Sequence, residues 1–170
     1  GNQVKCRRRM SNIKSLCVIV LLGLLVQDVI TGVSKDECLN EHNKYRAKHG
    51  APPLEWDNKL AKAAQKVAQN SKFEHSNNGF GENIAMSSDE MTCAKAIKMW
   101  YDEVKDYGKN NGGVTGHFTQ VVWKSSTKVG CSVGKPGGIS FSNGMKGQML
   151  ACNYSPPGNY QGEYEKNVQA

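Results

Sequence analysis

The sequence predicts an α+β fold, because helical patterns fill the first part of the chain and strand patterns follow. Three helical segments precede residue 108, and two short segments rich in branched and apolar residues, Lys128–Gly134 and Gln148–Ser155, come later. A link rich in Gly, Pro, Ser and Asn joins these two segments, as in a hairpin with a long loop. This order of elements is typical of the α+β class.

The helices are expected in the following order. The first covers about residues 36–49 and ends at Gly50, with two prolines beyond it. Asp57 can cap the second, whose small-residue face, residues 60–71, permits close packing. The third is expected to begin with a capping box at residues 87–90 and to stop at Gly108. The segment from residue 118 to residue 123 is compatible with either a strand or a short helix.

The length and the composition indicate one globular domain. The chain has 170 residues, of which 38% are hydrophobic and 22% are charged, so there is little room for a second core. Basic residues, an apolar run over residues 16–26 and small Gly32 precede the domain in the order of a signal peptide. We therefore expect residues 1–9 to be an upstream remnant, residues 10–32 a signal peptide and residues 33–170 a single secreted, extracellular domain.

The alternative for the apolar run is a membrane anchor. Its 11 residues would rise only about 16 Å as a helix, which is roughly half of a bilayer core. The N-terminal segment also accounts for much of the charge imbalance, because five of the 22 basic residues precede residue 33. Residues 33–170 hold 17 basic and 14 acidic side chains, a net charge of 17 − 14 = +3. Lysines dispersed over an ordinary surface argue against a nucleic-acid partner.

Four cysteines remain once the N-terminal segment is set aside. They are Cys38, Cys93, Cys131 and Cys152, which allow two disulfides with none left over. No pair has the two-to-four-residue spacing of zinc fingers or ribbons. In an oxidising compartment each bridge would contribute about 2–4 kcal/mol.

Four separate motifs now resemble those of one family. The sequence reads GHFTQVVW at residues 116–123 with KVGC at 128–131, LACNYSPPGNY at 150–160, HNKYR at 42–46 and the loop GENI at 81–84. In their order along the chain they are similar to the motifs of the CAP superfamily, the cysteine-rich secretory, antigen 5 and pathogenesis-related 1 proteins with an SCP domain. The compact length resembles the plant pathogenesis-related and Golgi-associated members.

The resemblance implies an α-β-α sandwich, with a three-stranded antiparallel sheet between helical layers. It makes residues 117–123 a short helix. Pairing of Cys131 with Cys152, inside the two expected strands, is similar to the family's habit. The cysteines that this pairing leaves over are Cys38 and Cys93.

The resemblance also implies a cleft that holds two histidines and two glutamates. Carried over residue by residue, these are His75, Glu82, Glu103 and His117. Glu103 lies three residues after Trp100 on the expected helix, beside an apolar face, where a carboxylate needs a partner. Two neutral imidazoles with carboxylates nearby can bind a divalent metal such as Zn²⁺, although no cofactor is required. The alternative is that each Glu holds a His by hydrogen bonds and so fixes loops onto the core.

Lipid binding is the function that we expect from the resemblance, since family members bind sterols, fatty acids or phospholipids. Peripheral contact with a membrane is compatible with such a role. Flexible apolar residues around the hairpin loop favour it, although residues of these types more often pack in a core. No residue is assigned to lipid binding. The apolar residues are Val129, Val133, Ile139, Phe141, Met145 and Met149.

Two other functions remain open. As a secreted effector, defence protein or toxin, the protein would recognise an unidentified receptor through loops at residues 77–79, 110–115 and 135–146. As a hydrolase, it would use Ser76 or Thr119 beside a cleft histidine. Adjacent side chains usually diverge, however, and no Gly-x-Ser-x-Gly elbow is present. We therefore expect no catalytic residues and no enzymatic activity.

Overall fold

The computed structural model describes residues 32–108 and 115–169. The expected upstream remnant and all but the last residue of the expected signal peptide lie outside these ranges, as does most of the loop at residues 110–115. The helices are α2 (Lys35–Lys48), α3 (Asn58–Ala68), α4 (Cys93–Asp102), the 3₁₀ turn η1 (Glu103–Asp106), α5 (Gly116–Val122) and α6 (Tyr164–Asn167). The strands are β1 (Glu55–Trp56), β2 (Gly81–Ser87), β3 (Lys128–Val133), β4 (Ile139–Ser140) and β5 (Lys146–Ser155).

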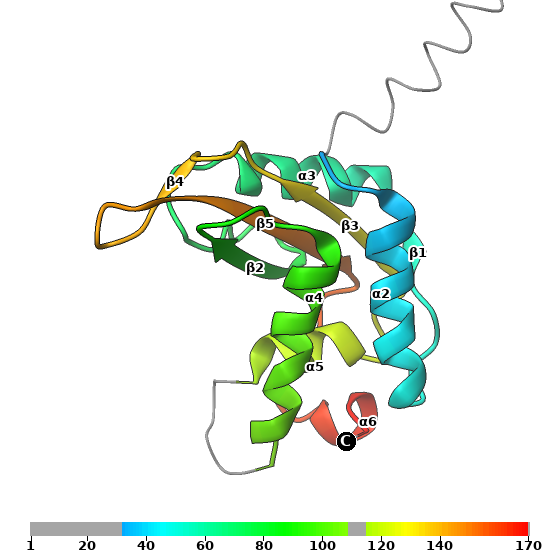
Figure 1. The fold of residues 1–170 in the computed structure, drawn as a ribbon. Coiled ribbons are helices and arrows are strands. Elements are labelled where there is room, and N and C mark those ends of the chain that lie inside the picture. The colour runs from blue at the N-terminus through cyan, green and yellow to red at the C-terminus, as the bar shows by residue number, and fades with distance from the viewer. Residues whose placement is uncertain (1–31, 109–114, 170) are drawn as a thin grey trace, which may run out of the picture. The chain divides into compact units, whose positions relative to one another are not determined.

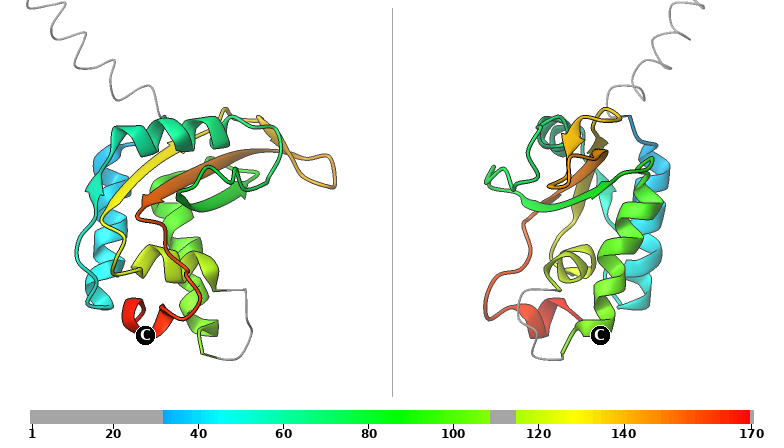
Figure 2. Two further views of the ribbon diagram at one scale, coloured as in Figure 1. Left: turned by 180° about the vertical axis from the view of Figure 1, so that it is seen from behind. Right: turned by 60° about the vertical axis from the view of Figure 1, so that its left-hand side comes forward.

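The described residues form the expected α-β-α sandwich. Helix α3 covers one face of the sheet, and α2, α4 and α5 pack together on the other side (Figures 1 and 2). Strands β3, β5 and β2 make the antiparallel centre, with β5 in the middle. Two short strands extend it, since β1 pairs in parallel with β3 and β4 pairs with β5. Residues 147–154 of β5 are all buried, because helices cover both faces of the strand.

The sequence prediction was wrong about residues 81–84, which it treated as a loop. They begin β2, whose register places Glu82 opposite Asn153 and Asn83 opposite Cys152. Gly, Glu and Asn have low strand propensity, so local sequence does not indicate a strand here. The strand forms because Ile84 and Ala85, on opposite faces of it, are both buried.

The expected capping box at residues 87–90 is also wrong. Ser87 is the last residue of β2 and pairs with Gln148, so α4 starts later, at Cys93. Thr92 is its N-cap, and the Thr92 hydroxyl accepts a hydrogen bond from the Lys95 backbone N–H at 3.2 Å. The α-helical part ends before Gly108, because the last turn tightens into η1.

The other expected helices are confirmed. Asp57 caps α3 by accepting hydrogen bonds from the backbone N–H groups of Lys59 and Leu60 at 2.7 and 3.1 Å. The small-residue face of α3 approaches β3 so closely that a Cβ atom at Gly130 would overlap the backbone of Ala61. Residues 116–122 form a helix, as the family resemblance implied. Within the described part of the chain, no helix is long and apolar enough to cross a membrane.

Both disulfides implied at the sequence level are present. Cys38 pairs with Cys93, which joins α2 to α4, and Cys131 pairs with Cys152 across directly opposed positions of β3 and β5. All four residues are fully buried. The bridges therefore connect elements within the layers of the core and do not tether a terminus or an exposed loop.

Arg46 of α2 is fully buried and links three segments. Its guanidinium donates hydrogen bonds to the backbone carbonyls of Pro52 at 2.8 Å and of Val121, Trp123 and Ser126 at 2.9 Å each. Burial lowers the pKa of Arg46 to about 10, so the side chain stays charged at neutral pH. Because Val121 and Trp123 lie at the C-terminal end of α5, the positive charge also meets the negative end of the helix dipole.

We expect Arg46→Met to lower the free energy of unfolding by about 3–5 kcal/mol, because it leaves several buried carbonyls without a donor. Urea denaturation followed by circular dichroism measures the change. Lys44→Gln is the matched control on the same helix, since the Lys44–Glu41 ion pair is at the surface, and the expected cost is below about 1 kcal/mol. Equal effects of the two substitutions would contradict the role assigned to Arg46.

Candidate functional site

His75 and Glu82 form the first of two His–Glu pairs. His75 lies on the segment that leads from α3 to β2, and its Nδ1 is 2.8 Å from Glu82 Oε1. Glu82 also accepts hydrogen bonds from the backbone N–H and the hydroxyl of Ser76. The Glu82 side chain is 6% exposed and the His75 side chain 55% exposed. A nearly buried carboxylate at the start of β2 therefore holds an exposed imidazole.

Glu103 and His117 form the second pair. Glu103 is the first residue of η1, and its Oε1 is 2.6 Å from His117 Nδ1. Its other oxygen, Oε2, accepts hydrogen bonds from the backbone N–H groups of His117 at 3.0 Å and Phe118 at 3.1 Å. Thr115, the N-cap residue of α5, makes no side-chain capping hydrogen bond. Glu103 thus caps α5 from another element and orients its histidine, which supplies the partners that the sequence analysis required for this carboxylate.

Consecutive residues of β2 attach both pairs to the sheet. Glu82 binds His75, and the Asn83 side-chain amide donates to the backbone carbonyl of His117 at 3.0 Å. The same amide lies 3.4 Å from the hydroxyl of Tyr154 on β5. The N-terminal end of β2 is therefore the point from which both histidine-bearing segments are positioned.

The four predicted site residues form two bonded pairs and not one ligand cluster. In the residues that the structure describes, the only three His, Cys, Asp or Glu ligand atoms within 4.8 Å of one another belong to Cys38, Cys93 and Cys131. These sulfur atoms are in disulfides and are not available as thiolates. That both His–Glu pairs serve one cleft stays a prediction.

An apolar pocket of about 270 Å³ lies next to the second pair. Phe73 and Met99, two of its lining residues, are 45% and 46% exposed. The Trp100 ring, also in the lining, stacks nearly parallel to the His117 imidazole, with ring centroids 6.2 Å apart. Helical spacing places Met99 one turn from Glu103, but no periodic pattern links the loop residue Phe73 to a helix residue 26 positions later. The complete lining is Phe73, Ile84, Ala85, Met86, Met99, Trp100, Glu103 and His117.

The two hydroxyls considered for hydrolysis are bonded to groups other than an imidazole. The Ser76 hydroxyl donates to Glu82 Oε2. Buried Thr119 has its hydroxyl 2.7 Å from Asn159 Oδ1 and 3.1 Å from the carbonyl of Thr115. A nucleophile needs its base at hydrogen-bond distance, and the described hydrogen bonds provide no such pair for either hydroxyl.

The apolar residues around the hairpin loop belong mainly to the core. Val129, Ile139 and Met149 are 0–2% exposed, whereas Met145 is 52% exposed. Core packing, the commoner role for residues of these types, accounts for these three buried side chains.

A buried series of hydrogen bonds leads from α2 to the backbone of His117 in the second pair. His42 Nδ1–H donates to the carbonyl of Cys38 at 2.7 Å, and His42 Nε2 accepts from the hydroxyl of Tyr154 at 2.8 Å. Burial lowers the pKa of His42 to about 4 and raises the pKa of Tyr154. Both groups are therefore neutral near pH 7, and the series continues through Asn83 to the backbone of His117.

Comparison with known proteins defines the class of this fold and site. Residues 39–154 match the family described as "CAP: Cysteine-rich secretory protein family". The chain belongs to this family. Within it, the chain is similar to plant pathogenesis-related proteins of type 1. Pathogenesis-related protein 1A of Nicotiana tabacum is 42% identical over 140 residues, which is 76% of this chain and 79% of that protein. Pathogenesis-related protein 1 of Arabidopsis thaliana is 34% identical over 152 residues, 85% of this chain and 90% of that protein.

Solved structures of the same fold are also similar. The crystal structure of NaASP2 with Zn²⁺ matches with a TM-score of 0.61 and 29% identity, over 76% of this chain and 84% of that chain. The crystal structure of MpPR-1i matches with a TM-score of 0.59 and 26% identity, over 75% of this chain and 90% of that chain. The α-β-α sandwich described above is thus the fold of its relatives.

We expect buried His42 to make the protein less stable in mild acid. Its pKa is about 4 in the folded protein against 6.5 ordinarily, so below pH 6.5 the unfolded chain binds a proton that the folded chain cannot. This contribution should reduce the free energy of unfolding by about 3 kcal/mol between pH 6.5 and pH 4, with no further loss below pH 4. Urea denaturation at pH 7 and at pH 4 measures it as the difference between wild type and His42→Gln.

The same pH dependence of wild type and His42→Gln would contradict this assignment. NMR titration of the His42 imidazole in the wild-type protein provides a second measurement that does not depend on the stability of the variant. A midpoint near 6.5 would also contradict it.

Proposed function

We propose that the protein is an extracellular plant-type defence protein that binds a sterol, fatty acid or phospholipid beside His117. Membership of a secretory family and similarity to pathogenesis-related proteins support the class and the compartment. Two buried disulfides support the compartment independently, because such bridges persist in oxidising environments. On this proposal residues 10–32 are the signal peptide and residues 33–170 the secreted domain.

The single observation that carries lipid binding is the pocket beside the second His–Glu pair. It combines exposed apolar side chains, Phe73 and Met99, with a polar imidazole at His117. Its volume of about 270 Å³ is at the lower limit for a drug-sized ligand. The pocket would therefore hold one part of an amphiphile, with Phe73 and Met99 covering the adjacent apolar surface of the ligand.

We expect the double substitution Phe73→Ser and Met99→Ser to reduce the capture of labelled cholesterol or fatty acid by about tenfold or more, because it removes the exposed apolar contacts. A pull-down with the purified protein measures retention. Met145→Ser with Tyr160→Ser is the matched control, since these side chains are 52% and 53% exposed and are not in the pocket lining. The proposal fails if the wild-type protein retains none of labelled cholesterol, fatty acid and phospholipid, or if both double variants retain as much as wild type.

A divalent metal is a second candidate ligand, supported by the orientation of the imidazoles. Each histidine uses Nδ1 for its glutamate, which leaves Nε2 as the ligand atom. A carboxylate behind a metal-binding imidazole is the usual arrangement, and it fixes the tautomer of the ring. His75 and His117 would hold Zn²⁺, with Glu82 and Glu103 as orienting groups and not as ligands. The bound ion would supply positive charge at the cleft.

Zinc uptake by calorimetry tests this candidate. We expect wild-type protein to bind Zn²⁺ and His75→Ala with His117→Ala to lose binding. Glu103→Gln should weaken affinity by about 10–100-fold, the usual effect of losing such an orienting partner. The control is His49→Gln, because His49 is bonded to Gln169 and Tyr101 outside the cleft. Unchanged uptake in the double-histidine variant would eliminate the proposed metal site.

The same geometry favours binding over catalysis. The Ser76 hydroxyl is bonded to Glu82, and the Thr119 hydroxyl is buried among backbone and amide oxygens. Nucleophilic catalysis would require one of these hydroxyls to reach an imidazole. We therefore propose a ligand-binding protein and assign no catalytic residue.

A further inference from the structure

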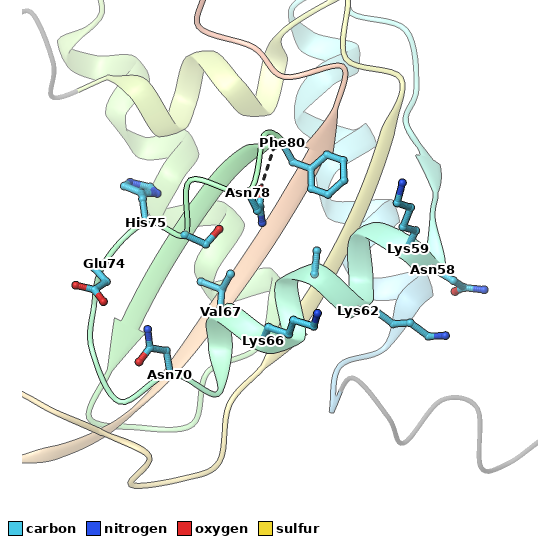
Figure 3. A pocket seen from close by; sticks show the side chains of 12 residues that line it. Asn58, Lys59, Lys62, Lys66, Val67, Asn70, Glu74, His75, Asn78 and Phe80 are labelled. Carbon is cyan, nitrogen blue, oxygen red and sulfur yellow. Dashed lines mark hydrogen bonds between the residues drawn. The ribbon is translucent and has the colours of Figure 1, made fainter.

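A second and larger pocket, of about 790 Å³, lies between α3 and the segment of residues 74–80 that precedes β2. Figure 3 shows side chains from α3 on one side of it and His75, Asn78 and Phe80 on the segment that faces the helix. We call it the α3 groove. Its lining residues are Asn58, Lys59, Lys62, Ala63, Lys66, Val67, Asn70, Glu74, His75, Ser76, Asn78 and Phe80.

Three lysines give the α3 groove its charge. Lys59, Lys62 and Lys66 are spaced at i, i+3 and i+7 and are all exposed, so they lie along one side of the helix over about 10 Å of its axis. Lys62 and Lys66 make no ion pair with any residue that the structure describes. The lining contains one carboxylate, Glu74. The groove is therefore complementary to a ligand with several spaced negative charges.

The uncharged lining has the groups that contact sugar rings. The Oδ1 atoms of Asn58, Asn70 and Asn78 each accept a hydrogen bond from within the protein. Their NH2 groups are the atoms that would donate to the hydroxyl groups of a saccharide. Phe80 is half-buried, and Lys59 Nζ lies 5.9 Å from the centre of its ring. An aromatic face beside a cation matches the apolar face and the charged substituent of an acidic sugar.

We propose that the α3 groove binds an acidic oligosaccharide, a chain of sugar rings that carries repeated carboxylates. A neutral lipid fits less well, because it offers no negative charge to Lys59, Lys62 and Lys66. Nucleic acid fits less well, because Phe80 and His75 are the only rings in the lining and no arginine lines the groove. The proposal uses a different surface from the lipid pocket and does not depend on it.

Binding of a galacturonic acid oligomer to the purified full chain, followed by calorimetry, tests the proposal. We expect Lys62→Gln with Lys66→Gln to weaken affinity about tenfold, and the affinity of the wild type to fall as salt is added. The control variant, Lys135→Gln with Lys166→Gln, removes the same charge from exposed positions outside the groove and should bind as the wild type does. All four lysines are exposed, so both variants should melt within a few degrees of the wild type.

Comparison of probes identifies the ligand class. The methyl-esterified oligomer keeps the sugar rings and loses the charges, and we expect it to bind at least about tenfold more weakly than the acid. Equal binding of the two oligomers, equal binding by the two lysine variants or no binding by the wild type would overturn the proposal. Tighter binding of phosphatidylserine vesicles or of single-stranded DNA through the same lysines would overturn it in favour of a lipid surface or a nucleic acid. Cholesterol capture by the groove variant separates this result from the fate of the lipid proposal.

Discussion

The site depends on charged side chains from other elements at both ends of the short helix α5. A seven-residue helix is too short to be stable alone, yet α5 carries His117. Glu103 accepts hydrogen bonds from the first backbone N–H groups of the helix, and Arg46 donates to the carbonyls at its end. Each charge has the sign that the helix dipole favours. The negative group at the start also orients the imidazole. Stability of the helix and geometry of the second His–Glu pair therefore have a common cause.

On β2, too, polar side chains hold a histidine-bearing segment in place by hydrogen bonds. Glu82 is nearly buried and would be costly without partners, but it accepts hydrogen bonds from the segment that carries His75. Asn83, its neighbour, joins the backbone of His117 to the chain formed by Tyr154 and His42. Polar groups that would destabilise an apolar core thus become specific connections between the sheet and the two histidine segments. This arrangement attaches the segments that hold the histidines to the sheet, although they are a loop and a short helix.

Local sequence predicted those elements whose stability is local, and failed where stability comes from distant residues. Asp57 caps α3 and Gly50 follows α2, so residues next to each helix are enough to predict where α3 begins and where α2 ends. The centre of the hairpin was also clear, because β3 and β5 contain runs of branched and apolar residues. Helix α5 had no decisive period, since Arg46 and Glu103 stabilise it from 75 and 14 positions away. Residues 81–84 were mistaken for a loop because burial of Ile84 and Ala85 by other elements forms β2. The two His–Glu pairs came from family resemblance, but nothing in the sequence placed Phe73 or Met99 beside His117.

The segment between α3 and β2 connects the two proposed ligand surfaces. It contributes Phe73 to the apolar pocket and Asn78 and Phe80 to the α3 groove. Glu82 fixes this segment through His75 and Ser76, which themselves line the α3 groove. The two surfaces share no lining residue, so their ligands would not compete for contacts. They do share an anchor, however, and a ligand that moved the segment at one surface would have to displace the same hydrogen bonds that shape the other. The hydrogen bonds of Glu82 to His75 and Ser76 are therefore the connection to β2 that both surfaces have in common.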